Sequence, residues 1–347
     1  MTTKNYLANH NDFLHILRMI TKIADNHHRN DLFFKKIEQI YVFLKENIKQ
    51  ILSNTEIFDI IKNNKKILLY FLQNDILILN KEICDEIIIK CDNNGLQYSH
   101  FFIKEIKQKF RQFITKYEIE DIEEEFLRKY LDILDGNFDS KILKGENDSY
   151  LCSLIRDDLI EDFITYVNRT NLSLSETFIK KSFFETNSFL LEKDSISLIE
   201  YSAFFGSIQI YRFLKMNKVE LTPSLWLYSI HGGNADLIHD LEESKVNEPN
   251  SDFYIECFIE SIKCHHNEFA AYFENNFLSQ EDMKNSDIIY SIFHYYNYSY
   301  FPSDFDIDNC DIFTNLCYHN YDDIVNSLLE KKGENIIKGL IISLFFL

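Results

Sequence analysis

The sequence of 347 residues is poor in glycine and proline, with 8 glycines and 3 prolines. Both counts lie far below average usage, which excludes collagen-like and low-complexity chains. The shortage also argues against a sandwich of many short strands, because such folds need turn residues at short, regular intervals. Asparagine is abundant and can form some of these turns. The composition therefore favours a helical protein.

Several signals of catalysis and membrane insertion are missing as well. The sequence has no G-x-x-x-x-G-K-[ST] or G-x-G-x-x-G phosphate loop, no G-x-S-x-G elbow and no H-E-x-x-H motif. No uncharged apolar run approaches the roughly 18 residues of a membrane helix, and the first residues are mostly polar, unlike a secretory signal. We therefore expect a non-enzymatic protein with no cofactor, metal or membrane span. The cytoplasm is the expected location, with the nucleus left open.

Seven cysteines are scattered along the chain, an odd number that fits free thiols in a reducing compartment. Two groups combine cysteine with histidine: Cys257, Cys264, His265 and His266, and Cys310, Cys317 and His319. Two cysteines separated by two helical turns are too far apart to share one zinc ion without bending, and zinc sites use closer pairs in turns. Thiols packed between helices are the preferred interpretation. A metal-binding module is the less favoured alternative.

Negative charge is concentrated in the second part of the chain. Residues 1–147 carry 22 basic and 23 acidic side chains, whereas residues 148–347 carry 14 basic and 32 acidic ones, a net charge of −18. Such a surface repels nucleic acid and anionic membranes, and it favours a basic protein partner. Solubility alone is the alternative explanation.

Apolar residues recur at intervals of three and four through most of the chain, the pattern of amphipathic helices. Turn signals at 135–137 and 144–148 coincide with the change in charge. They predict a helical N-terminal region over residues 1–147 and a second region over 148–347. The two regions can also be continuous, because segment 57–75 has the pattern of a helix pair.

The second region contains an internal repeat. Segment 202–214 recurs 27 residues later, and a third copy follows 32 residues after the second. A fourth copy lies 114 residues after the first. Each copy pairs two short helices across a tight turn that favours left-handed backbone, and such a unit buries its apolar face only by stacking on its neighbours. The repeat-defining residues are Ala203, Gly206, Ile210, Leu214, Gly233, Leu237, Leu241, Cys317, Ile324 and Leu328.

The Ala-x-x-Gly-x-x-x-Ile-x-x-x-Leu pattern that begins at Ala203 resembles the ankyrin repeat, and Thr222-Pro223 is similar to the helix opener of that family. The family's Thr-Pro-Leu-His motif is nowhere intact, and the period of 27 is shorter than the usual length of about 33. The whole chain is similar to divergent, uncharacterised ankyrin-type proteins of protists. This resemblance implies an all-α solenoid of helical hairpins that binds a protein through its turn tips and inner-helix faces. His231, His265 and His319 are the candidate contacts.

The C-terminal end suggests an alternative function. Nine of the twelve residues from Ile336 to Leu347 are apolar, and their register fits the first helix of an incomplete last repeat. Twelve residues fall short of the roughly 20 that a membrane anchor needs. A structural or self-associating protein that uses this apolar end is therefore the alternative to an interaction scaffold.

Overall fold

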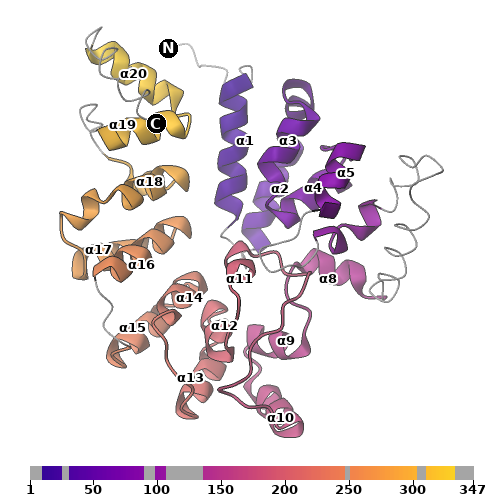
Figure 1. Cartoon of the computed structure of the whole chain (residues 1–347), viewed down its shortest axis with the longest axis vertical. Coiled ribbons are helices and arrows are strands. Elements are labelled where there is room, and N and C mark those ends of the chain that lie inside the picture. The colour runs from indigo at the N-terminus through magenta and orange to yellow at the C-terminus, as the bar shows by residue number, and fades with distance from the viewer. Residues whose placement is uncertain are drawn as a thin grey trace. The chain divides into compact units, whose positions relative to one another are not determined.

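The computed structural model describes residues 10–25, 31–89, 98–106, 136–246, 251–302 and 310–332 (Figure 1). The chain divides into two compact units, unit 1 (residues 1–246) and unit 2 (residues 247–347). The described residues form helices and connecting loops, and their only β-type pairing is an isolated antiparallel bridge between Phe178 and Ser197. No helix in these ranges is both long and apolar enough to cross a membrane.

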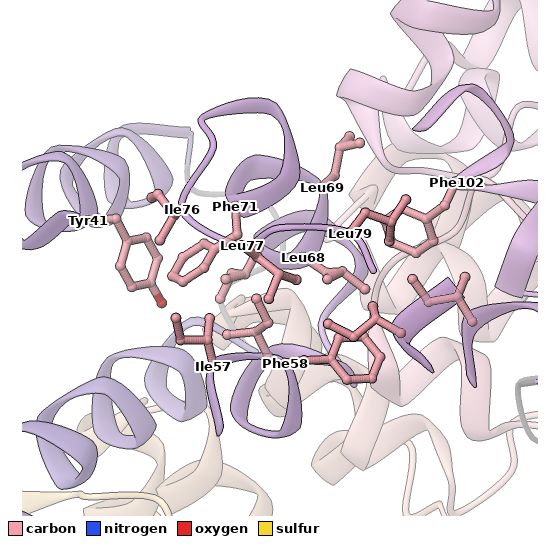
Figure 2. Close-up of a cluster of buried hydrophobic side chains, with 14 of the residues drawn as sticks. Tyr41, Ile57, Phe58, Leu68, Leu69, Phe71, Ile76, Leu77, Leu79 and Phe102 are labelled. Atoms are coloured by element: carbon pink, nitrogen blue, oxygen red, sulfur yellow. The ribbon is translucent and has the colours of Figure 1, made fainter. Parts of the chain in front are cut away.

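Unit 1 begins with a group of helices that share one apolar core. They are α1 (His10–Ala24), α2 (Asp31–Ile51), α3 (Asn54–Ile61), α4 (Lys65–Gln73), α5 (Lys81–Ile89) and, after a short 3-10 turn at Tyr98–His100, α8 (Phe138–Lys144). Figure 2 shows the centre of this core, where the Tyr41 ring meets the edge of Phe71 at 4.8 Å between centroids. The β-branched run at residues 87–89, compatible with a strand by itself, is the end of helix α5.

Three helical hairpins complete unit 1. They are α9 (Tyr150–Arg156) with α10 (Ile160–Thr170), α12 (Leu198–Phe204) with α13 (Ile208–Met216), and α14 (Leu225–Gly232) with α15 (Ala235–Glu243). The first helices of the hairpins pack side by side, since α12 contacts both α9 and α14. A long connection between α10 and α12 contains the short helix α11 (Ser188–Glu192). The boundary that the sequence suggests near residue 147 lies inside this unit.

Unit 2 repeats the arrangement. Its elements are α16 (Ser251–Lys263), α17 (Asn267–Asn276), a 3-10 turn (Asp282–Lys284), α18 (Ser286–His294), a second 3-10 turn (Tyr298–Tyr300), α19 (Cys310–Tyr318) and α20 (Asp322–Lys332). Helix α18 packs on α16 and on α19, so the first helices again lie side by side. The apolar segment Ile336–Leu347 lies outside the described residues.

The same backbone geometry recurs where the first helix of each hairpin ends. One residue there has a positive φ, between 51° and 65°, which reverses the chain within one turn. These residues are Asp158, Gly206, Gly233, His265, Tyr296 and Asn320. Gly233 follows Gly206 by 27 residues, His265 follows Gly233 by 32 residues, and Asn320 follows Gly206 by 114 residues. These separations equal the offsets between the copies of the sequence repeat.

Consecutive hairpins are joined by a recurring hydrogen bond. The donor is the side chain of the residue that directly follows the left-handed residue of one hairpin. The acceptor is a backbone carbonyl in the preceding hairpin, and it lies three residues before the left-handed residue of that hairpin. The donors and acceptors are Ser207 to Ile155, Asn297 to Ile262 at 3.1 Å, and Tyr321 to Phe293 at 2.9 Å. Because buried carbonyls need a donor, this bond helps to fix how these three hairpins sit on the hairpins before them.

The carboxylate of Asp158 adds another bond between hairpins. It accepts hydrogen bonds from the backbone N–H groups of Gln209 and Ile210, both at 3.0 Å, in the first turn of α13. Asp158 therefore caps the N-terminus of α13 with its side chain. Helix α13 belongs to the next hairpin, and it receives no side-chain hydrogen bond from its own N-cap, Ser207. Its side-chain cap therefore comes from the preceding hairpin.

Candidate interaction surfaces

The repeat-defining residues have different surroundings in the two units. In unit 1 the apolar ones (Ala203, Ile210, Leu214, Leu237 and Leu241) are buried between helices. In unit 2, Ile324 and Leu328 are half-buried. Cys317 is exposed, so this small side chain is not buried as Ala203 is in unit 1.

The three candidate contact histidines also differ. His231 is buried, with its ring 4.1 Å from the Phe189 ring between centroids, so it belongs to the packing of unit 1 and not to its outer surface. His265 is the left-handed residue of its turn, and burial lowers the pKa of its imidazole below the ordinary value of 6.5. The ring of His319 lies in an aromatic cluster with Tyr290 and His294.

One set of equivalent positions carries two of these rings, those of His231 and His294. We call it the turn-proximal row, defined as the residues two positions before each left-handed turn residue. The row consists of Arg156, Phe204 and His231 in unit 1, and of Lys263, His294 and Tyr318 in unit 2. In unit 1 the rings of Phe204 and His231 stack across neighbouring helices, 5.2 Å apart and tilted by 28°.

The turn-proximal row of unit 1 is covered by the chain itself. Phe189, from helix α11, stacks on Phe204 at 5.7 Å and 9°, and it meets the Tyr228 ring edge to face at 5.0 Å. Phe189, Phe204 and Tyr228 are each at most 3% exposed. A short segment bearing one aromatic side chain therefore fills this face.

The corresponding row of unit 2 is open to solvent in part. Tyr318 is 69% exposed and Tyr290 38% exposed, and their rings lie 6.2 Å apart. The Tyr290 ring stacks on His294 at 4.9 Å and 17°, and the hydroxyl group lies within hydrogen-bond distance of His294 Nδ1, at 3.2 Å. His319 packs at 5.1 Å from Tyr290 and 5.2 Å from His294. We call these four residues the aromatic row of unit 2.

A buried polar network holds the α10–α12 connection in place. Glu185 accepts hydrogen bonds from the backbone N–H groups of Thr186, Asn187 and Asn147 at 3.0, 2.9 and 3.3 Å. The ammonium group of Lys65, itself 1% exposed, donates to the backbone carbonyl of Glu185 at 3.1 Å. This network joins helix α4 to the connection that carries Phe189, so it positions that side chain.

Glu185 should make the stability of unit 1 depend on pH. Burial raises the pKa of its carboxyl above the ordinary value of 4.5, Glu146 adds to this effect, and the three N–H donors oppose it. The ionised form therefore lowers the free energy of unfolding, and this penalty disappears as pH falls from above the raised pKa toward 4.5. Glu185→Gln, which imitates the protonated carboxyl, should be more stable than the natural protein at pH 8, and the difference should shrink on acidification. Urea unfolding of both proteins between pH 8 and pH 5 measures it, and a constant difference would contradict the assignment.

Two cysteines of the first cysteine–histidine group are buried in unit 2. Cys257 and Cys264 are at most 1% exposed, and burial raises the pKa of each thiol well above 9. The thiol form is therefore favoured at neutral pH, as expected of cysteines that fill space between helices. Cys84, Cys152, Cys257, Cys264 and Cys317 are free thiols.

Sequence reasoning did not find Phe189 or Tyr290. Neither belongs to a repeat motif, and phenylalanine and tyrosine are too frequent in this chain, at 31 and 20 residues, to stand out. Both rings pack against members of the turn-proximal row, and that row can be aligned only when the left-handed residues at His265 and Tyr296 are known. Comparison with protein-family models, with curated proteins and with solved structures gives no match for this chain.

Proposed function

We propose that the protein is a non-catalytic scaffold of ankyrin-like hairpin repeats that binds a basic protein partner. The observation that carries this proposal is the recurring inter-hairpin hydrogen bond, made by Ser207 in unit 1 and by Asn297 and Tyr321 in unit 2. A bond repeated at equivalent positions is typical of stacked repeats, and stacked repeats generally present extended binding surfaces.

Charge supports a basic partner. Residues 247–347 carry 17 acidic and 5 basic side chains, a net charge of −12, and residues 148–246 carry 15 acidic and 9 basic ones. A surface of one sign accelerates association with the opposite sign and discourages partners of the same sign. A cytoplasmic location stays a prediction from the sequence.

The proposal is tested by binding at two salt concentrations. The full chain is immobilised and exposed to native lysate at about 50 mM and about 500 mM salt, a range over which screening of exposed charges becomes strong. We expect a basic protein to be retained at low salt, to bind again when purified, and to associate more slowly at high salt. Retention of nucleic acid in place of protein, or binding that salt does not affect, would overturn the proposal.

A charge variant makes this test specific. Glu268→Gln with Asp287→Asn removes two exposed acidic groups of unit 2, and Glu38→Gln with Glu46→Gln removes two from α2, in the nearly neutral N-terminal region. The unit 2 variant should associate with the purified partner more slowly, whereas the α2 variant should match the natural protein. Equal effects of the two variants would show that unit 2 does not attract the partner.

A further inference from the structure

We propose that the aromatic row of unit 2 (Tyr290, His294, Tyr318 and His319) docks a partner segment that carries one aromatic side chain flanked by lysine or arginine. This inference rests on the proposed scaffold function and deepens it, because it names the chemistry of the partner and the face that receives it. Three observations carry it: the intramolecular contact in unit 1, the exposure of the row in unit 2, and the charge around it.

Unit 1 contains an example of the contact. Helix α11 has only five residues, and its Phe189 meets Phe204, Tyr228 and His231 with ring centroids 4.1 to 5.7 Å away. Two of these three rings belong to the turn-proximal row. The row thus accepts an aromatic side chain from a short segment that runs across the first helices of two hairpins.

Unit 2 has rings on the same row without comparable burial. His294 and Tyr318 occupy the turn-proximal positions of α18 and α19, and Tyr290 stacks on His294. Tyr228, Phe204 and His231 are 0–4% exposed in unit 1, whereas Tyr318 is 69% and Tyr290 is 38% exposed. His319 of the same row is only 8% exposed, so the open part consists of the two tyrosines, and exposed large side chains on two adjacent hairpins are typical of interaction sites.

Charge selects a basic flank for the docked segment. In unit 1, Lys193 follows Phe189 by four residues, and its Nζ lies 4.5 Å from the centroid of the Phe189 ring. In unit 2 the exposed acids Asp287 and Asp322 lie three residues before Tyr290 and four residues after Tyr318. With a net charge of −12 in this unit, lysine or arginine beside the aromatic anchor meets opposite charge.

The chain itself supplies the probe. A fluorescein-labelled peptide with the sequence of residues 186–194, in which Glu192 and Asp194 are replaced by lysine, keeps Phe189 and gains a basic flank. A second peptide also carries Phe189→Ala. Fluorescence anisotropy measures the affinity of each peptide for the full chain, for Tyr318→Ala and for the control Tyr150→Ala, an exposed tyrosine of unit 1.

We expect saturable binding of the first peptide to the natural protein. Tyr318→Ala should weaken it by about fivefold or more, the effect of losing one aromatic pair, and Tyr150→Ala should leave it unchanged. The peptide without phenylalanine should also bind about fivefold more weakly or worse. Since Tyr318 is largely exposed, its replacement should not unfold unit 2, and an unchanged circular dichroism melting curve verifies this.

Three results would overturn the inference. They are no saturable binding up to about 1 mM protein, equal binding by Tyr318→Ala, and equal binding of the two peptides. Equal binding by Tyr318→Ala would mean that the peptide binds elsewhere, for example by displacing Phe189 in unit 1. If the lysate experiment yields a salt-sensitive basic partner while one of these results is obtained, the partner chemistry is wrong and the scaffold function stands.

Discussion

Gly232→Ala is expected to lower the free energy of unfolding of unit 1 by about 2–3 kcal/mol, the cost of overpacking a closed helix contact. Gly232 is the last residue of α14, and a methyl group there would overlap the backbone carbonyl oxygen of Ala203. The amide nitrogen of Gly206 would lie 3.3 Å from the same methyl group, and the carbonyl of Phe204 3.4 Å. These atoms are backbone, so they cannot turn aside as a flexible side chain can.

The sign of this effect is diagnostic, because alanine in place of glycine usually stabilises a helix by up to about 1 kcal/mol. Gly136→Ala is the control, since nothing lies within 4 Å of its added methyl group. Urea unfolding monitored by circular dichroism compares both variants with the natural protein. A Gly232→Ala protein as stable as the control would show that α12 and α14 are not in this close contact.

The helical class and several turns could be predicted from the sequence. Amphipathic periodicity is local, so it survives in a single sequence, and glycine marks a left-handed turn because it lacks a Cβ. Gly206 and Gly233 both have positive φ. His265 and Tyr296 have it too, but tyrosine is not a residue type that signals this conformation, so the turn at Tyr296 has no clear mark in the sequence.

The contacts that define the candidate surface could not be predicted in the same way. Phe189 reaches His231 across 42 residues of sequence, and no periodic pattern connects the two. The sequence marks His231 as a polar residue near a helix end, which favours a surface position. The aromatic side chain from the α10–α12 connection covers it, and only the three-dimensional path of that connection reveals this.

Arg156→Met should destabilise unit 1 by about 3–5 kcal/mol, the usual cost of removing one partner of a buried ion pair. Arg156 is 4% exposed, and its Nε lies 2.8 Å from a carboxylate oxygen of Glu146. One terminal nitrogen also donates to the carbonyl of Asn147 at 2.7 Å and to the Tyr201 hydroxyl at 3.0 Å. Methionine fills similar volume, so the loss is mainly one of charge and hydrogen bonding and not of packing.

The effect should be largest with Glu146 intact, because its carboxylate would then remain in a mostly buried site with only the half-exposed Lys144 ammonium group, 3.5 Å away, as counter-charge. Adding Glu146→Gln to Arg156→Met removes that charge and should recover part of the lost stability, which a double-mutant cycle by urea unfolding measures. Arg169→Met, on the exposed face of α10, is the control and should change stability by less than about 0.5 kcal/mol. If Arg156→Met costs no more than this control, the guanidinium is not buried against Glu146 in solution. A large cost that Glu146→Gln does not reduce would instead assign the stabilisation to the Asn147 and Tyr201 hydrogen bonds, which remain broken in the double variant.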